Sequence, residues 1–227
     1  MKLALFILVA ALLTACGTLP LLTGLTGSVV AECEALERQS SRDTCYAEFG
    51  ILRSDINLCD RASSEASRFY CYEKIAEQTS APQVCAQITD SYWQPICYKE
   101  VGINLNNSLL CGEVSKDDMR NECFYEVALS TADEKLCPSI GDEIIYVRCI
   151  TKLAVAKRNL NICFQLDRTT LHHDRCILKA AKAAGNPTYC NFMSFPTVKE
   201  MCFEIVEEIA AERRAARNSQ NASNTTL

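Results

Sequence analysis

The spacing of the cysteines constrains the fold of this chain more than any other feature of its sequence. Apart from Cys16, the cysteines lie alternately 12 and 14 residues apart, a period of 26 residues that runs seven times with one additional residue in the sixth copy. Self-similarity at such a fixed period is typical of proteins built from stacked structural repeats. The sequence therefore predicts seven short repeats with two cysteines each. The repeating cysteines are Cys33, Cys45, Cys59, Cys71, Cys85, Cys97, Cys111, Cys123, Cys137, Cys149, Cys163, Cys176, Cys190 and Cys202.

Each repeat carries the signals of a first helix around its first cysteine. Four residues before that cysteine, five of the last six copies have Asp or Asn, whose side chains accept hydrogen bonds from the open N–H groups of a helix start. The exception is Ala81, where we expect Ser80 to form the cap instead. An apolar residue three positions after the cysteine shares its helix face, so we expect a first helix of about two turns. The five caps are Asp55, Asn107, Asp133, Asn159 and Asn186.

A second, longer helix is predicted around the second cysteine of each repeat. In six copies a further capping residue, such as Ser115 or Asp142, stands seven or eight positions before this cysteine. An aromatic or aliphatic residue directly follows the cysteine, which gives a core face to a helix of about four turns. A small residue five positions after the cysteine predicts the close approach of a neighbouring helix. The small residues are Gly50, Ala76, Gly102, Ala128, Ala154 and Ala181.

The distance between paired cysteines requires a turn inside each repeat. Twelve residues of continuous helix span about 18 Å, whereas a disulfide needs Cα atoms about 4.4–6.8 Å apart. Pairing at the 12-residue spacing joins the two helices of one repeat, and pairing at the 14-residue spacing joins consecutive repeats. Local geometry allows both. We favour the first because the second leaves Cys33 and Cys202 unpaired.

These patterns together predict an all-α fold, an α-solenoid of about seven disulfide-stapled helix-turn-helix repeats over residues 32–217. The polar stretch 218–227 is expected to be a disordered tail. The array resembles in concept the secreted cysteine-rich Sel1-like repeat proteins, whose helical hairpins are also cross-bridged. Their repeat is longer, and the spacing of their cysteines differs.

The N-terminus has the pattern of a signal peptide over residues 1–15. Lys2 is followed by eleven apolar residues from Leu3 to Leu13, a run that is too short to cross a bilayer. Simple secretion with cleavage nearby, or an uncleaved anchor, would also fit this run.

A lipid attachment site is predicted directly after the apolar run. The sequence Leu13-Thr14-Ala15-Cys16 resembles the lipobox of bacterial and archaeal lipoproteins. This resemblance implies cleavage before Cys16 and attachment of a diacylglyceryl group to its thiol. Setting Cys16 aside also leaves an even number of cysteines for disulfides. Residues 16–31 then form the lipidated cysteine and a connector.

Several classes of site are missing from the sequence, and we predict no catalytic, cofactor-binding or metal-binding residues. No CxxC pair, GxSxG, HExxH, phosphate-binding or dinucleotide-binding motif occurs. His172 and His173 are the only histidines, they point in different directions on a helix, and no third ligand accompanies them. A formal net charge of −5 argues against a nucleic-acid partner.

From these observations we expect an extracytoplasmic, membrane-anchored protein of the cell surface or periplasm. Fifteen cysteines indicate an oxidising compartment, and a repeat array offers an extended surface for a protein partner. The predicted function is therefore that of a protein-interaction module or scaffold that contacts the membrane through its lipid. An envelope spacer without a ligand is the alternative, and an enzyme with an unrecognised site is disfavoured. Asn106, Asn221 and Asn224 begin glycosylation sequons, which matter only in a host that glycosylates exported proteins.

Overall fold

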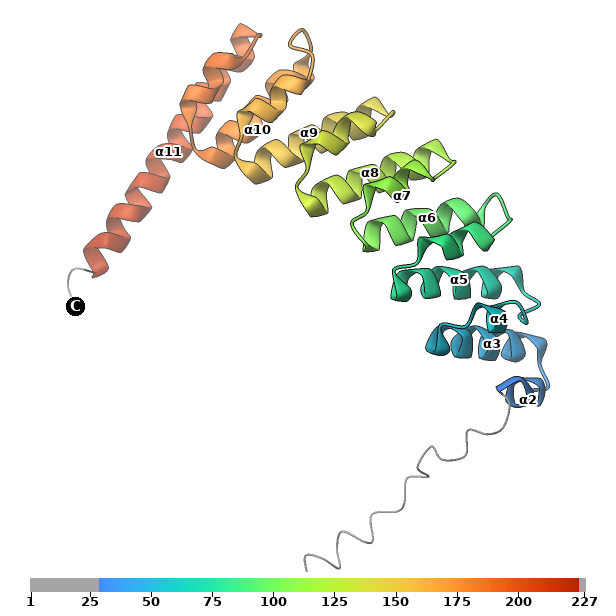
Figure 1. Cartoon of the computed structure of the whole chain (residues 1–227). Coiled ribbons are helices and arrows are strands. Elements are labelled where there is room, and N and C mark those ends of the chain that lie inside the picture. Colours follow the sequence, from blue (N-terminus) through green and yellow to red (C-terminus); the bar gives the residue numbers. More distant parts are fainter. Residues whose placement is uncertain (1–28, 225–227) are drawn as a thin grey trace, which may run out of the picture. The chain divides into compact units, whose positions relative to one another are not determined.

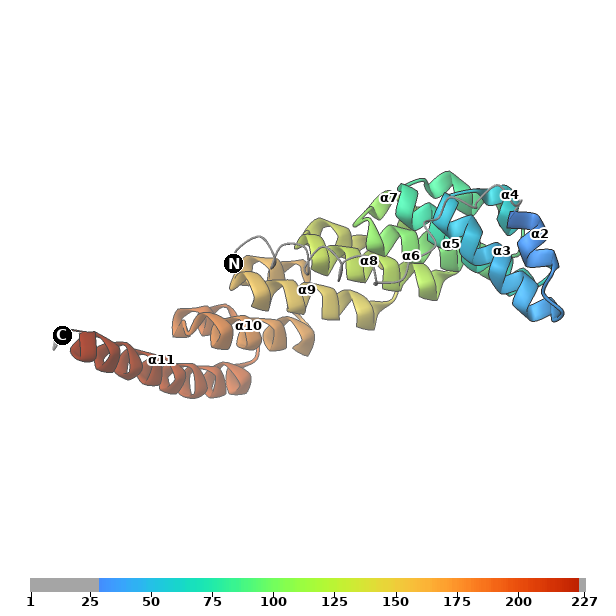
Figure 2. The ribbon, with the colours of Figure 1, turned by 90° about the horizontal axis from the view of Figure 1, so that it is seen from below.

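The structure, a computed structural model, describes residues 29–224, and in that range it consists of helices joined by short turns, without strands (Figures 1 and 2). This confirms the all-α repeat fold. The predicted signal peptide, Cys16 and the connector up to residue 28 lie outside the described residues. The chain divides into two compact units, with the boundary inside one long helix between Cys71 and Tyr72.

Each repeat consists of a short helix followed by a long one. The long helices are α3 (Gln39–Arg53), α5 (Glu65–Thr79), α6 (Trp93–Asn104), α8 (Asp117–Thr131), α9 (Glu143–Lys157), α10 (Leu171–Ala184) and α11 (Pro196–Asn224). The short helices are α2 (Val29–Glu34), α4 (Ile56–Cys59), η1 (Pro82–Gln87), α7 (Ser108–Gly112), η2 (Glu134–Ser139), η3 (Leu160–Gln165) and η4 (Pro187–Phe192). The first unit contains α2, α3, α4 and the start of α5, and the second contains the remaining elements.

The short helices are shorter than the sequence led us to expect. They have four to six residues in place of two turns, and four of them are 3₁₀ helices. In those four repeats the backbone becomes extended at the apolar residue three positions after the cysteine, as at Ile88 and Ile140. Ile88 is fully buried there. The chain therefore leaves the helix at the residue whose side chain enters the core.

The junction between repeats is the same turn six times. Six of the long helices are followed by another repeat. Near the end of each of these helices, one residue has a left-handed backbone, with φ between 51° and 64°. The next residue donates its N–H to the carbonyl of the small residue five positions earlier, as Asp55 does to Gly50 at 2.9 Å. This is the bond that closes a Schellman motif. The left-handed residues are Ser54, Ser80, Asn106, Ala132, Arg158 and Gly185.

The predicted Asp and Asn caps of the short helices are confirmed. Each of the five side chains accepts a hydrogen bond from the backbone N–H two residues later, at 3.0–3.1 Å. The expectation for Ser80 was wrong, because Ser80 occupies the left-handed position at the end of α5 and Ala81 is the capping residue without a side-chain bond. Ser115 also does not cap, since α8 begins after Lys116, which makes no side-chain cap bond.

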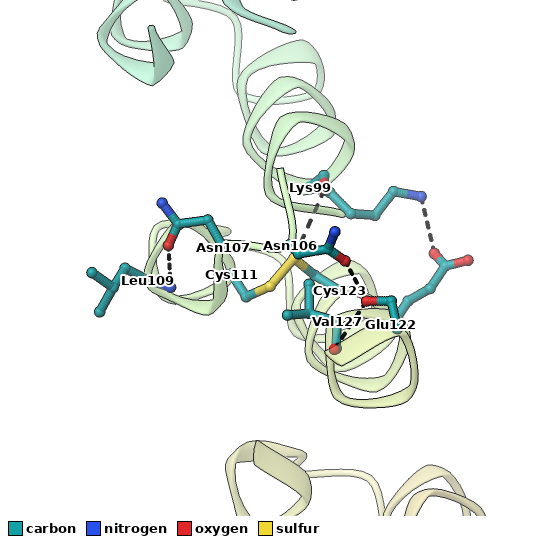
Figure 3. Close-up of a disulfide and its surroundings, with 9 residues drawn as sticks. Lys99, Asn106, Asn107, Leu109, Cys111, Glu122, Cys123 and Val127 are labelled. Carbon is teal, nitrogen blue, oxygen red and sulfur yellow. Dashed lines mark hydrogen bonds and ion pairs between the residues drawn. A yellow bond between two sulfur atoms is a disulfide. The ribbon is translucent and has the colours of Figure 1, made fainter. Parts of the chain in front are cut away.

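Seven disulfides join the short and long helix of each repeat at the 12-residue pairing, or 13 residues in the sixth copy. The paired Cα atoms lie 5.5–5.8 Å apart. Figure 3 shows the bridge from Cys111 in α7 to Cys123 in α8. Cys45 is partly exposed, and the other paired cysteines are buried in the core.

The two glycines among the small residues, Gly50 and Gly102, pack against the disulfide of the next repeat. A Cβ atom added to Gly102 would stand 3.2 Å from the Sγ atom of Cys123 and 3.2 Å from the Cβ atom of Leu110. The close approach predicted from the small residues therefore exists, and in this repeat the approaching atoms include a disulfide sulfur.

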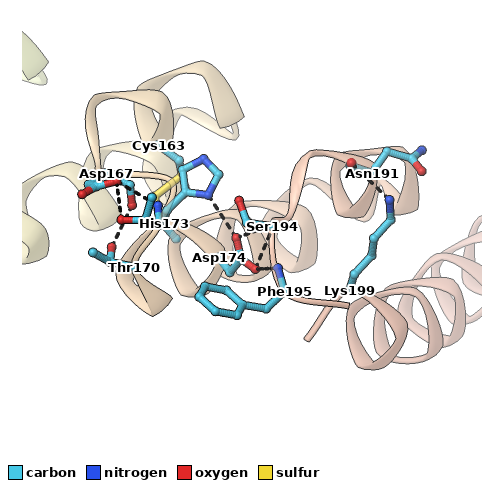
Figure 4. Close-up of polar contacts among 11 residues, drawn as sticks. Cys163, Asp167, Thr170, His173, Asp174, Asn191, Ser194, Phe195 and Lys199 are labelled. Carbon is cyan, nitrogen blue, oxygen red and sulfur yellow. Dashed lines mark hydrogen bonds and ion pairs between the residues drawn. A yellow bond between two sulfur atoms is a disulfide. The ribbon is translucent and has the colours of Figure 1, made fainter. Parts of the chain in front are cut away.

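At three of the junctions between repeats, a buried polar side chain of one repeat also bonds to the backbone of the next. Asp174 in α10 accepts hydrogen bonds from the backbone N–H groups of Ser194, at 3.0 Å, and Phe195, at 2.8 Å, just before α11 (Figure 4). Asp43 does the same for Ser63 and Ser64 in the first unit. Asn121 accepts from the backbone of Gly141, also at 2.8 Å. Each of these side chains satisfies open N–H groups near the start of the following long helix.

The last long helix continues further than expected. α11 runs to Asn224, beyond residue 217, where we placed the end of the repeat domain. No Gly or Pro follows Pro196 within this helix to end it. Among residues 29–224, no helix combines the length and the apolar character needed to cross a membrane.

Candidate functional site

A basic groove lies between α9 and α10, which run side by side in the second unit (Figures 1 and 2). Its volume is about 710 Å³, and its lining includes five Lys and Arg side chains and one His but no Asp or Glu. The lining residues are Ile144, Val147, Arg148, Thr151, Lys152, Val155, His172, Arg175, Lys179, Lys182 and Ala183. We refer to this feature as the α9–α10 groove.

The helical period places these side chains on the two walls of the groove. On α9 the lining residues recur at intervals of three and four from Ile144 to Val155, which keeps them on one stripe of the helix. Cys149 and Leu153 lie between them in the sequence and are buried in the core. The disulfide and the core contact therefore fix which side of α9 faces the groove.

The cations of the two walls occupy equivalent positions in consecutive repeats. Arg148 and Arg175 each directly precede the second cysteine of their repeat, and Lys152 and Lys179 each follow it by three residues. Like charges are thus repeated from one helix to the next. Such an arrangement is unfavourable for the protein alone and becomes favourable when an anion lies between the walls.

The lining cations have no partner of opposite charge within the described chain. Between residues 29 and 224, no carboxylate lies within 4.0 Å of any of them. All five Lys and Arg side chains, and His172, are exposed to solvent. The segment 143–182 has eight Lys and Arg residues against three Asp and Glu, a net charge of +5 in a chain of −5. Positive charge is therefore concentrated around the groove.

The positive surface begins at α9. On α8, the positions equivalent to Arg148 and Lys152 are occupied by Glu122 and Glu126. The Glu122 carboxylate pairs with the Lys99 Nζ atom at 3.0 Å (Figure 3). Burial raises the pKa of Tyr125 on α8, and the positive charge of Arg148 acts in the opposite direction. At these two positions the sign of the charge thus changes between α8 and α9.

The two histidines considered in the sequence have separate environments. His172 lines the groove, whereas His173 is fully buried. The His173 Nδ1 atom lies 3.0 Å from Asp174 Oδ1 (Figure 4), and its Nε2 atom has no hydrogen-bond partner. Among residues 29–224 no group of three His, Cys, Asp or Glu side chains is arranged to hold a metal ion. The adjacent histidines are therefore not brought together in one site.

The sequence analysis missed the groove, although a signal for it exists. Arg148 and Lys152 are four residues apart, as are Arg175 and Lys179, and the two pairs are one repeat apart. The charged residues therefore follow the 26-residue period of the cysteines in these two repeats, apart from the one additional residue of the sixth copy.

Comparison of the chain with protein-family models, with curated proteins and with solved structures produced no match.

Proposed function

We propose that this protein is an extracytoplasmic interaction module, held on a membrane through a lipid on Cys16, that binds an anionic partner in the α9–α10 groove. The observation that carries the proposal is the set of six exposed basic side chains that line one groove without any acidic residue. In a chain with a net charge of −5, this concentration of positive charge sets the groove apart from the rest of the chain.

The location outside the cytoplasm is supported by the seven disulfides. Disulfides form and persist in oxidising compartments, and a protein with this number of them indicates an extracytoplasmic environment. The anchoring part of the proposal is supported by the sequence around Cys16 alone. Because one acyl chain binds a membrane only marginally, a stable anchor requires two or more chains.

A spacer without a ligand explains the groove less well. A spacer needs the disulfides and the buried core, which the chain supplies in every repeat, and helix caps, which Asp and Asn side chains supply for five of the short helices. It does not need like charges at equivalent positions of two consecutive helices, since these charges weaken the packing of α9 on α10. Binding of an anion turns the same charges into a favourable contribution.

The proposal is tested by measuring the binding of three polyanions to the oxidised full chain: polyphosphate, poly-glutamate, and vesicles that contain anionic lipid. We expect at least one of them to bind in a salt-dependent manner. The double variant Lys152→Glu/Lys179→Glu should weaken that binding at least tenfold. The control is Lys135→Glu/Arg214→Glu, which makes the same change in net charge at two exposed positions outside the groove.

Two results would contradict the proposed function. One is the absence of binding to all three polyanions, and the other is an equal loss of binding in the groove variant and in the control. Circular dichroism should show the same helical content in both variants, because all four substituted side chains are exposed.

A further inference from the structure

We infer that the α9–α10 groove binds an acidic amphipathic helix of a partner protein, whose carboxylates flank a stripe of aliphatic side chains. This inference rests on the proposed function, and it specifies the class of the anionic partner. It follows from the length of the groove, the position of its aliphatic residues and the spacing of its cations.

The length of the groove requires an elongated ligand. The lining residues extend from Ile144 to Val155 on α9 and from His172 to Ala183 on α10. Either stretch covers about 16 Å at the rise of an α-helix, about three turns. A single phosphate or carboxylate group would contact only a small part of this length. A helix of about three turns laid along the groove would meet all of it.

Three of the four aliphatic residues of the groove are less exposed than its cations, whereas Ile144 is 71% exposed. Val147, Val155 and Ala183 are half-buried, and Val147 also packs against the core of the second unit. The five Lys and Arg side chains are exposed. The groove therefore has an aliphatic floor with cations along both edges. A ligand that contacts both the floor and the edges must therefore carry apolar groups between two rows of negative charge.

The spacing of the cations matches that of carboxylates on a helix. Arg148 and Lys152 are one turn apart on α9, about 6 Å, and Arg175 and Lys179 repeat this spacing on α10. Glutamates at i and i+4 on one face of a helix have the same separation. A helix with such glutamates on both sides of an aliphatic stripe places charge against each wall, as flanking residues do in coiled coils. Recognition of this kind is the helix-in-groove mode of binding.

Two other classes of anionic ligand fit the groove less well. Single-stranded nucleic acids are bound by several aromatic side chains on which successive bases stack, and the lining residues include no Phe, Tyr or Trp. An anionic membrane attracts basic residues that reach its surface, but a flat bilayer would leave the half-buried Val147 and Val155 uncovered. Only an amphipathic helix uses the charges and the floor together.

The experiment compares two synthetic peptides with the same composition of Glu, Leu and Ala and the same net charge. In the first, leucines recur at intervals of three and four with glutamates on both flanks, and in the second the same residues are scrambled. Binding to the oxidised full chain is measured by fluorescence anisotropy. We expect the amphipathic peptide to bind at least tenfold more tightly than the scrambled one. The variant Lys152→Glu/Lys179→Glu should lose this binding, and a peptide with lysines in place of the glutamates should then bind that variant.

A change in the floor separates the inference from general attraction of anions. Val155→Ser removes aliphatic surface without changing charge. It should weaken the binding of the amphipathic peptide severalfold and leave the binding of polyphosphate unchanged. Equal binding of both peptides, or binding of polyphosphate or anionic vesicles alone, would overturn the inference and leave the proposed function standing. No binding of any of these probes would overturn both.

Discussion

Gly50 in α3 lies directly against the disulfide sulfur of Cys71 in α5. A Cβ atom added to Gly50 would stand 2.7 Å from that Sγ atom and 3.2 Å from the Sγ atom of its partner Cys59. Four other repeats have Ala at the equivalent position, and those alanines are fully buried. The first repeat therefore packs more tightly against the next disulfide than an alanine would allow.

Gly50→Ala should destabilise the first unit. Overpacking lowers the free energy of unfolding by about 1–3 kcal/mol. Replacing Gly by Ala within a helix raises it by about 0.5–1 kcal/mol. We expect a net loss of about 1 kcal/mol, measured by thermal unfolding and by faster hydrogen exchange of the α3 amides. Gly102→Ala is the matched control, because its nearest neighbours would stand at 3.2 Å and need to move less. An equal effect of the two substitutions would contradict this explanation.

Asp174→Ala should loosen the junction between α10 and α11. The substitution leaves the backbone N–H groups of Ser194 and Phe195 without their acceptor, at a cost of about 1–3 kcal/mol. Hydrogen exchange at these two amides should become faster. Asp174→Asn should have a smaller effect, because an amide oxygen can also accept a backbone hydrogen bond at such a junction, as the side chain of Asn121 does from Gly141. Unchanged exchange in the alanine variant would show that this contact does not stabilise the junction.

The first unit should lose stability in acid because of Asp43. Burial acts to raise the pKa of this carboxyl, but hydrogen bonds from the Gln39 side chain and from the Ser63 and Ser64 backbone, with the charge of Arg42, hold the pKa below its usual value. Its stabilisation is therefore complete above the unfolded-state pKa of about 3.9 and is lost as the pH falls through the lower folded-state pKa. Below about pH 4 the protection factor of the Ser63 amide, its intrinsic exchange rate divided by its measured rate, should fall. In Asp43→Asn this acid dependence should be much weaker, and an equal acid dependence would contradict the assignment.

The Cys33–Cys45 disulfide should be the first to open under mild reduction. Cys45 is partly exposed, whereas the other thirteen paired cysteines are buried, and a reductant must reach a sulfur atom to attack it. Alkylation after brief reduction, followed by peptide mapping, should label Cys33 and Cys45 before Cys111 and Cys123. The unreduced map should contain only links of 12 or 13 residues. A link from Cys45 to Cys59 would contradict the pairing.

Cys16→Ser should release the protein from the membrane or block cleavage of the precursor. The lipobox-like sequence implies that the Cys16 thiol carries the lipid, and serine cannot form the thioether. Detergent phase partition and intact mass measure the two outcomes. As a control, the non-reducing disulfide map of the Cys16→Ser variant should be unchanged, because Cys16 is not expected to form a disulfide. Unchanged partition and unchanged processing would rule out the anchor.

The sequence alone determined the features that depend on short-range bonds. The 26-residue period gave seven repeats, and complete pairing of the cysteines selected the link within each repeat. The Asp and Asn caps were predictable because a cap needs only its own side chain and the N–H two residues later, as at Asn107 and Leu109 (Figure 3). Each of these features is contained within one repeat and can be read from the identity and spacing of neighbouring residues.

The tertiary structure alone decided which polar and charged side chains meet between repeats. The partners of Asp174 lie 20 and 21 residues away, and nothing in the local sequence shows that this carboxylate is buried against the next helix. The α9–α10 groove likewise depends on which faces of two helices turn outward together. That orientation is fixed by the packing of Cys149, Leu153 and Cys176 in the core, where all three are buried. Burial and juxtaposition across repeats arise only when the helices stack, so they are properties of the packed array.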